Sequence, residues 1–260
     1  MTDKEKRICK ISIIFAALAI GQNASAMHIM EGYLPPVFCI AWGTVCIPFL
    51  VKGFIGVKKV FTENPKAITM LAMSGAYIFV LSALKIPSVT GSCSHMTGTG
   101  LGAILFSPCT TSILGIIVLL FQAILLAHGG LTTLGANTFS TAIAGPFVSF
   151  GIYKIFMKCN LNKRTGVFLA AATGDLFTYC VTSIQLAIAY PSPNGGLKAS
   201  VLEFLGVFAP TQIPLSIVEG LLTVMIVIAL ENYAGQELKA VGFAKADRLK
   251  KNSKKAKNTV

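Results

Sequence analysis

The chain contains three histidines, and one of them stands where it could bind a metal ion together with a newly formed N-terminus. Met27 and His28 follow Ala24-Ser25-Ala26, which has the A-x-A form of a signal-peptide cleavage site. After cleavage, the Met27 amine, the His28 amide nitrogen and the His28 imidazole could close adjacent chelate rings around one cation. A second imidazole would complete a planar nitrogen site. Such a site suits late first-row divalent metals and excludes magnesium and calcium, which prefer oxygen.

His95 is the best candidate for the second imidazole. It lies within residues 91–100, whose glycines permit a tight, non-helical backbone around a buried pocket. Cys93, two residues away, could offer sulfur, which would favour a soft metal. His128, in a glycine-rich connection, could orient a ligand imidazole or serve as a structural histidine at the membrane interface. Glu31 could help to seat the N-terminal arm; a role at the lipid interface or as a helix cap is the alternative.

Residues 1–26 have the three parts of a secretory signal: a basic start, an apolar run over 11–20 and a polar end over 22–26. The apolar run is shorter than the roughly 20 residues that a spanning helix needs. We therefore expect cleavage after Ala26, with Met27 on the outer side of the membrane. If the segment were retained, the amine ligand would be lost and the proposed site could not form.

The composition indicates that most of the chain lies in lipid. Hydrophobic residues make up 54% of it and charged residues only 12%, and the mean hydropathy is +0.72. Its long apolar runs lack the alternation of barrel strands, so we expect an all-α, polytopic membrane protein. The net charge of +12 comes mostly from short connections and the C-terminal tail, and no aromatic stacking surface accompanies it, so we expect no nucleic-acid partner. The seven cysteines are scattered and odd in number, which disfavours a disulfide framework.

The apolar segments predict the topology. They are 36–52, 67–86, 99–127, 134–156, 166–190 and 210–231, with 202–208 as a short lead-in to the last. Basic residues in the 52–66 connection, the 158–164 connection and the tail place all three in the cytoplasm. An outer N-terminus and a cytoplasmic C-terminus require an odd number of crossings. Proline interrupts the long 99–127 segment at Ser107-Pro108, so we expect that segment to be double and the mature chain to have seven helices.

The chain therefore divides into a cleavable signal peptide at 1–26, a transmembrane metal-binding domain at 27–235 and a basic cytoplasmic tail at 236–260. Asp175 lies inside an apolar segment, where a carboxylate is costly, so we expect it to hold an interhelix contact or a neighbouring subunit. The sequence has neither the H-E-x-x-H motif of a metallopeptidase nor a G-x-x-x-x-G-K-[ST] phosphate loop. We expect a non-catalytic chain whose energy comes from partners. A secondary transporter driven by an ion gradient is a rival interpretation, for which Asp175 alone is thin support.

Three motifs, at residues 27–35, 91–102 and 128–137, closely resemble the CbiM family, the cobalt-specific S components of energy-coupling factor (ECF) transporters. The resemblance covers essentially the whole chain after residue 26. It implies that Met27, His28 and His95 bind the metal. The positions of His128, Glu31, Cys93 and Asp175 make them possible supporting residues.

The same resemblance implies the cargo and the partners. Cobalt(II) would be a transported ligand rather than a cofactor, and it would supply cobalamin biosynthesis. Planar nitrogen coordination alone favours nickel(II) or copper(II), so a nickel(II)-specific S component is the alternative. The expected partners are a CbiQ-like T component, CbiO-like ATPase subunits and a small CbiN-like membrane subunit.

Overall fold

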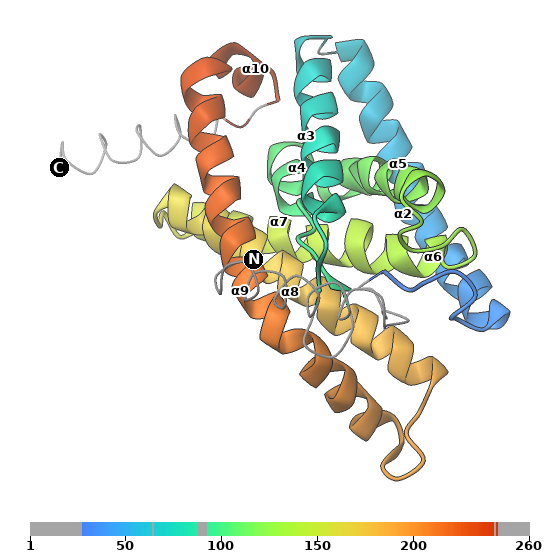
Figure 1. The fold of residues 1–260 in the computed structure, drawn as a ribbon. Coiled ribbons are helices and arrows are strands. Elements are labelled where there is room, and N and C mark those ends of the chain that lie inside the picture. The colour runs from blue at the N-terminus through green and yellow to red at the C-terminus, as the bar shows by residue number, and fades with distance from the viewer. Residues whose placement is uncertain (1–27, 64, 88–92, 242, 244–260) are drawn as a thin grey trace, which may run out of the picture.

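The computed structural model describes residues 28–63, 65–87, 93–241 and 243 (Figure 1). The predicted signal segment, Met27 and the tail beyond residue 243 lie outside this part of the chain. The described elements are α2 (Pro36–Glu63), α3 (Pro65–Ala83), β1 (Ile86–Pro87), β2 (Cys93–Ser94), α4 (Thr99–Leu105), α5 (Pro108–Leu125), α6 (Leu134–Asn137), the π-helix η1 (Thr138–Ala144), α7 (Gly145–Lys158), α8 (Lys163–Ala189), α9 (Gly196–Tyr233) and α10 (Gly235–Ala240).

Six helical stretches in the described residues are long and apolar enough to cross a bilayer. They are Pro36–Glu63, Pro65–Ala83, Pro108–Leu125, Leu134–Lys158, Lys163–Ala189 and Gly196–Tyr233. Lipid favours helices because each backbone N–H and C=O must find its partner within the segment. The predicted all-α membrane architecture is confirmed at this level, and the seventh crossing stays a prediction.

The break at Ser107-Pro108 is where the sequence predicts it. Helix α4 ends at Leu105, and α5 begins at Pro108. The Ser107 side chain caps α5 by accepting a hydrogen bond from the Thr110 N–H at 3.1 Å. Every residue of α4 is buried, but its 7 residues span only about 10 Å of a bilayer core about 30 Å thick.

Two helices extend beyond the apolar segments of the sequence. Helix α2 continues past residue 52 to Glu63, so most of the basic 52–66 segment is helical. The 202–208 lead-in is continuous with the following segment in the single helix α9, although Pro210 and Pro214 lie inside it. Proline is tolerated there because neighbouring groups in a membrane protein can satisfy the backbone atoms that it leaves unpaired.

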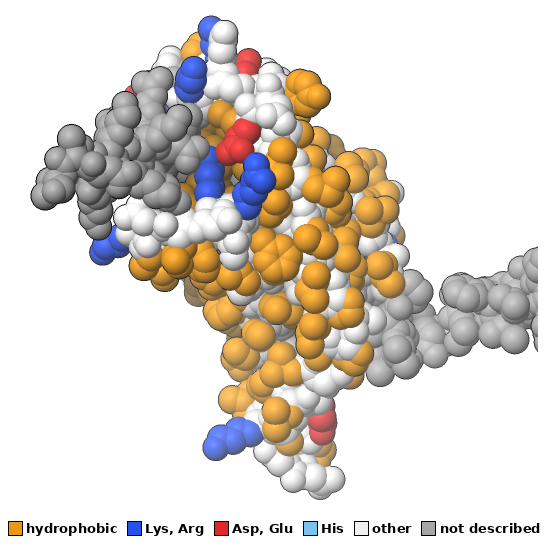
Figure 2. All heavy atoms as spheres, turned by 90° about the vertical axis from the view of Figure 1, so that its left-hand side faces the viewer, with side chains coloured by type: hydrophobic (Ala, Val, Ile, Leu, Met, Phe, Trp, Pro, Cys, Tyr) orange, Lys and Arg blue, Asp and Glu red, His pale blue; other side chains and the backbone are white. Residues whose placement is uncertain are grey.

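Helix α8 lies along α9 and also contacts α7, whereas α2 packs against α5 (Figure 1). One apolar core joins Leu101 of α4 to Val167 of α8 and Val227 of α9. A second core packs Ile29 and Leu34, from the segment before α2, against α6, α8 and α9. Hydrophobic side chains cover the middle of the face in Figure 2, and most of its charged side chains lie toward the ends. This distribution is typical of a surface that faces lipid.

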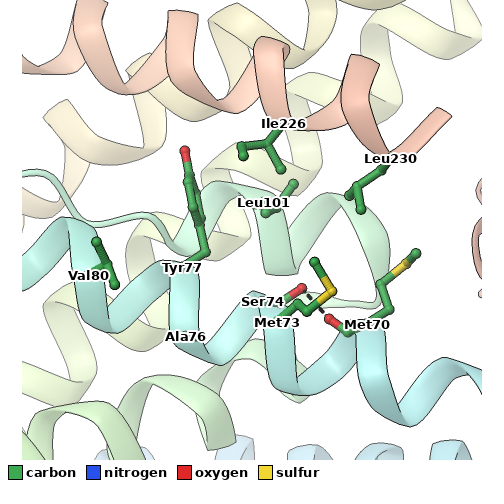
Figure 3. Close-up of a pocket in the computed structure, with 9 residues that line it drawn as sticks. All are labelled: Met70, Met73, Ser74, Ala76, Tyr77, Val80, Leu101, Ile226 and Leu230. Carbon is green, nitrogen blue, oxygen red and sulfur yellow. Dashed lines mark hydrogen bonds between the residues drawn. The ribbon is translucent and has the colours of Figure 1, made fainter. Parts of the chain in front are cut away.

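An apolar groove of about 310 Å³ separates part of α3 from α4 and α9 (Figure 3). Its polar groups are already paired within the protein. The Ser74 hydroxyl donates to the Met70 carbonyl at 2.9 Å, and the Tyr77 hydroxyl lies 3.0 Å from the Thr223 hydroxyl. The groove therefore presents an apolar surface, and none of the three histidines lines it.

Close contact between α2 and α5 depends on Gly53. A Cβ atom at this position would lie 2.1 Å from the Cys109 carbonyl oxygen and 2.9 Å from Ile113 Cγ1. We expect Gly53→Ala to lower the free energy of unfolding by about 1–3 kcal/mol through overpacking. Gly43→Ala on the same helix is the matched control, since nothing lies within 4 Å of its added Cβ. Thermal denaturation of both variants in detergent tests this. Equal midpoints would contradict the close packing.

Candidate metal centre

The three histidines, which are far apart in the sequence, meet in one buried cluster. His28 opens the N-terminal arm (residues 28–35), His95 follows β2 in the His95 loop (residues 93–98), and His128 lies in the His128 turn (residues 126–133) after α5. Their exposed fractions are 1%, 0% and 2%. One ligand atom from each lies within 4.8 Å of the other two, an arrangement that could hold a metal ion.

His28 Nδ1 is the atom that the other two rings approach. It lies 2.9 Å from His95 Nε2 and 2.8 Å from His128 Nε2. The ring centroids of His28 lie 4.5 Å from those of both neighbours, and the His95 and His128 centroids are 5.0 Å apart. Metal–nitrogen bonds of about 2.0–2.1 Å at right angles would place neighbouring ligand nitrogens about 2.9 Å apart. The observed separations match that spacing.

A backbone carbonyl fixes the tautomer of His95. Its Nδ1 lies 2.9 Å from the Met96 carbonyl oxygen, which can only accept, so Nδ1 carries the proton. In the neutral ring, Nε2 then presents a lone pair to His28 Nδ1. A single proton on His28 Nδ1 cannot point along both short contacts at once, and His28 Nε2 has no hydrogen-bond partner among the described residues. His28 Nδ1 offers either one proton or one lone pair, so only one of its two short contacts can be a full hydrogen bond.

Burial keeps the imidazoles neutral. Desolvation, followed by the charges that His95 and His128 would carry, lowers the pKa of His28 well below its usual value. Desolvation also lowers the pKa of His95 to about 4, although its bond to the Met96 carbonyl acts in the opposite direction. The pKa of His128 falls to about 2, again mainly through burial. At neutral pH all three rings are therefore available as metal ligands.

Hydrogen bonds to the backbone hold the N-terminal arm in place. The Ile29 N–H donates to Asn137 Oδ1 at 2.8 Å, and the Ile29 carbonyl accepts from Asn137 Nδ2 at 3.0 Å and from the Thr133 hydroxyl at 2.6 Å. The Glu31 carboxylate accepts from the Thr132 N–H at 3.2 Å. The residue next to His28 is thus fixed to the end of the His128 turn and to α6.

Two helices, α8 and α9, hold the backbone of the His95 loop. Tyr179 of α8 pairs with the backbone of His95 in both directions: its hydroxyl donates to the carbonyl at 2.9 Å and accepts from the N–H at 3.2 Å. Glu219 of α9 accepts from the Thr97 N–H at 2.6 Å and from the Gly98 N–H at 3.0 Å. These bonds fix the backbone on both sides of the His95 ring.

The other predicted residues lie around the cluster or outside the described part of the chain. Asp175 of α8 does not touch the imidazoles; it accepts a hydrogen bond from Gln212 of α9, whose amide also donates to the His95 carbonyl at 3.4 Å. The backbone of Cys93 pairs with Pro87 in the short sheet, and its side chain lies outside the described atoms. Met27 also lies outside the described residues.

Sequence reasoning did not single out Glu219, Tyr179, Gln212 or Asn137. Glu219 is completely buried in an apolar helix, so the reasoning that selected Asp175 would have found it. Tyr179, Gln212 and Asn137 gave no comparable signal, because polar neutral residues are common in membrane helices.

The comparisons agree with this architecture. A family model described as "Cobalt uptake substrate-specific transmembrane region" matches residues 28–236. The chain is 69% identical over 244 residues to the cobalt transport protein CbiM of Lachnoclostridium phytofermentans, covering 94% of this chain and 98% of that protein. It is 55% identical over 238 residues to the CbiM of Ruminiclostridium cellulolyticum, covering 92% and 96%. A crystal structure of a transition metal transporter aligns with a TM-score of 0.69 at 28% identity, covering 84% of this chain and 97% of that one.

The fold and the cluster define a multi-pass membrane protein with a buried, three-histidine candidate metal site. The chain belongs to the CbiM family, the substrate-specific transmembrane components of cobalt uptake systems. This confirms the family resemblance of its three motifs. The family consists of transport components, which agrees with the expectation of a non-catalytic chain.

Glu219→Gln tests how firmly the His95 loop is held. The substitution replaces one acceptor oxygen by an amide group, so a buried N–H at residue 97 or 98 loses its partner. We expect the free energy of unfolding to fall by about 1–3 kcal/mol. Glu203→Gln is the control, since Glu203 is exposed on the same helix. Denaturation midpoints of the metal-free variants provide the measurement, and equal effects at both positions would argue against a role for Glu219 in the loop.

The neutral histidines predict how stability depends on pH. An unfolded histidine has a pKa of about 6.5, whereas burial holds the pKa of His95 at about 4. Below about pH 6.5 the unfolded state therefore binds more protons, so the free energy of unfolding should fall as pH falls toward 4. Thermal midpoints of the metal-free protein at a series of pH values test this. His95→Gln should show a shallower decline, and a wild-type midpoint that rises on acidification would contradict the prediction.

Proposed function

We propose that this chain captures cobalt(II) at the outer face of the membrane, as the S component of an ECF transporter. The observation that carries the proposal is the convergence of His95 Nε2 and His128 Nε2 on His28 Nδ1, at 2.9 and 2.8 Å, in a buried and neutral cluster. The names of its relatives, which are cobalt transport proteins, support cobalt as the cargo.

The proposed ligands are the amine of Met27, the amide nitrogen and Nδ1 of His28, and Nε2 of His95. The two imidazole nitrogens have the separation expected of neighbouring ligands around one ion. The Met96 carbonyl orients the His95 ring, and the bonds from Asn137 and Thr133 to Ile29 orient the backbone that carries His28. Nickel(II) suits the same planar nitrogen set and is the alternative cargo.

The proposed topology begins with cleavage after Ala26, which places the new amine outside, and ends with the basic tail in the cytoplasm. Seven helices then cross or enter the membrane, with the short α4 and the long α5 together forming the double segment. Lys52, Lys58 and Lys59 in the C-terminal half of α2 support this orientation, because cytoplasmic segments carry an excess of basic residues.

The energy for import is proposed to come from partner subunits. The sequence contains no phosphate loop of the G-x-x-x-x-G-K-[ST] type. A CbiQ-like T component, CbiO-like ATPase subunits and a CbiN-like membrane subunit would complete the system, which would feed cobalamin biosynthesis.

A secondary transporter driven by an ion gradient is the alternative from another class. Asp175 and Glu219, two carboxylates completely buried in membrane helices, are the observation in its favour. Both accept hydrogen bonds from their neighbours, which gives them a structural role as well. Cobalt uptake by cells with and without the ATPase subunits separates the two interpretations, since gradient-driven uptake would survive the loss of those subunits.

His28→Ala and His95→Ala should each abolish high-affinity cobalt binding, because each removes one nitrogen from the ion. Met30→Ala is the control, as Met30 lies on the same arm but is exposed. Isothermal titration of the purified variants with cobalt(II) provides the measurement. Retention of wild-type affinity by both histidine variants would refute the site.

The N-terminus needs a test of its own. Intact-mass analysis of the purified, metal-loaded protein should give the mass of a chain that begins at Met27 and carries one metal ion. A chain that begins at residue 1 and still binds cobalt normally would exclude the amine ligand while leaving the imidazoles in place.

A further inference from the structure

The apolar groove between α3, α4 and α9 has a buried floor and an exposed rim (Figure 3). Met70 of α3 and Leu101 of α4 are buried on its floor, whereas Met73 and Val80 of α3 are exposed on its rim. Helices α3 and α9 are both long and apolar enough to cross a bilayer. In a membrane the rim therefore meets lipid tails, which can enter the groove from the side.

The dimensions of the groove fit one acyl chain. Its α3 wall extends from Met70 to Val80, and ten steps of 1.5 Å make about 15 Å, half the thickness of a bilayer core of about 30 Å. One leaflet supplies acyl chains of this reach. A helix about 10 Å across would occupy about 1,200 Å³ over the same length, against about 310 Å³ here. A partner's helix could only lie across the groove, whereas an extended chain can enter it.

A lysine continues the α3 wall beyond one end of the groove. Six residues of α3 line the groove, and at about 100° per residue they spread over an arc of about 160° with Lys66 in its middle. Lys66 precedes Met70 by four residues, so it lies on the same face, one turn beyond the groove. It is exposed. The apolar wall thus ends on a positive charge.

The α9 wall ends on a tyrosine at the corresponding place. Ile226 and Leu230 line the groove from α9, and Tyr233, three residues further on, ends that helix. The same 100° step places Tyr233 on the face of Ile226 and Leu230. Its side chain is exposed. Tyrosine is enriched where a bilayer meets water, because its ring is apolar and its hydroxyl can bond to headgroups.

Neighbouring acidic groups leave the charge of Lys66 uncancelled. Among the described residues, Glu63 and Glu231 form salt bridges with other lysines, at 3.8 and 2.8 Å. Helix α10 contacts both α3 and α9, and it carries one acidic and one basic residue, Glu237 and Lys239, whose charges offset each other. The mouth of the groove therefore favours an anion.

We propose that the groove binds one anionic phospholipid, with an acyl chain between α3 and α9 and the phosphate beside Lys66 and the Tyr233 hydroxyl. Basic pockets between membrane helices on the cytoplasmic side bind anionic headgroups in this way. The proposed topology assigns the lipid to the cytoplasmic leaflet. None of the three histidines lines the groove, so this lipid is a second ligand, separate from the metal.

The headgroup is tested by native mass spectrometry of the full chain in detergent. The probes are phosphatidylglycerol and phosphatidylcholine with identical acyl chains. The wild type should prefer phosphatidylglycerol, and Lys66→Gln should weaken its binding about fivefold, the contribution expected of one lysine beside an anionic headgroup. Phosphatidylcholine binding should not change. Lys58→Gln is the control, since Lys58 is exposed on α2.

The acyl chain is tested by filling the groove. Ala76 lines it and is exposed, so the ring of Ala76→Trp can occupy the groove without entering the core. This variant should lose binding of both lipids, whereas Ala41→Trp, at an exposed alanine of α2, should keep it. Phosphatidylglycerol with a photoactivatable group on its acyl chain should label the wild type on the groove residues of α3 and α9.

Other results overturn the inference. Equal weakening by Lys66→Gln and Lys58→Gln would show a general attraction to basic residues, and label spread evenly over the lipid-facing helices would exclude a groove site. If Ala76→Trp does not fold, the labelling of the wild type still decides. Cross-links from the groove to a co-purified membrane subunit, with phosphatidylglycerol excluded, would assign the groove to a protein.

Failure of the proposed function is a different outcome. Lys66→Gln should bind cobalt(II) as tightly as the wild type does, because Lys66 is far from His28 in the sequence and on the opposite end of α3 from the His95 loop. A chain that binds no cobalt could still bind the lipid. In detergent the two leaflets no longer exist, so the lipid result is also independent of the proposed topology.

Discussion

The structure depends on removing three imidazoles from water while keeping them neutral. Burial makes the charged form of each ring unfavourable, and proximity makes two charges more unfavourable still, so the pKa of every member of the cluster is lowered. Two imidazole nitrogens approach His28 Nδ1, which can form a full hydrogen bond with only one of them. Such an arrangement is poor as a resting core and well suited to a divalent cation that accepts nitrogen donors.

The surrounding helices convert this local chemistry into fixed geometry. Both ligand-bearing backbones are held by paired hydrogen bonds: Asn137 and Thr133 hold the residue beside His28, and Tyr179 and Glu219 hold the backbone around His95. Polar groups on membrane helices must find partners inside the protein, because lipid offers none. Burying these polar side chains in a membrane helix is energetically unfavourable unless they are paired. Because each has few alternative partners, its hydrogen bonds hold the ligand-bearing backbone in one geometry.

Different physical signals explain what could be predicted from the sequence. The helices and the break at Ser107-Pro108 are local features, and hydropathy and proline indicate them directly. The pairing of His28 with His95 was predicted from the chelate at the N-terminus, which needs a second imidazole, and from the glycine-rich 91–100 segment, which offers one. The distances between the histidine rings depend on how the helices pack against each other. So does the hydrogen bond from Thr97 to Glu219, two residues that are 122 positions apart in the sequence. No local pattern carries that information, so the equal closeness of His95 and His128 to His28 was not foreseen.

His28 and His95 come from separate segments, so an ion bound by both would also tie the N-terminal arm to the His95 loop. A ligand stabilises one arrangement over another only by the difference between its affinities for the two. Only the assembled arrangement brings the His28 and His95 nitrogens together, so the full contribution of both imidazoles would favour it. The arm is already fixed through Ile29, and therefore little ordering opposes binding. The same fixation opposes release, because a ligand can leave only when contacts of the arm or the loop break. Emptying such a site requires these contacts to break, which agrees with the proposed dependence of this chain on energy-supplying partners.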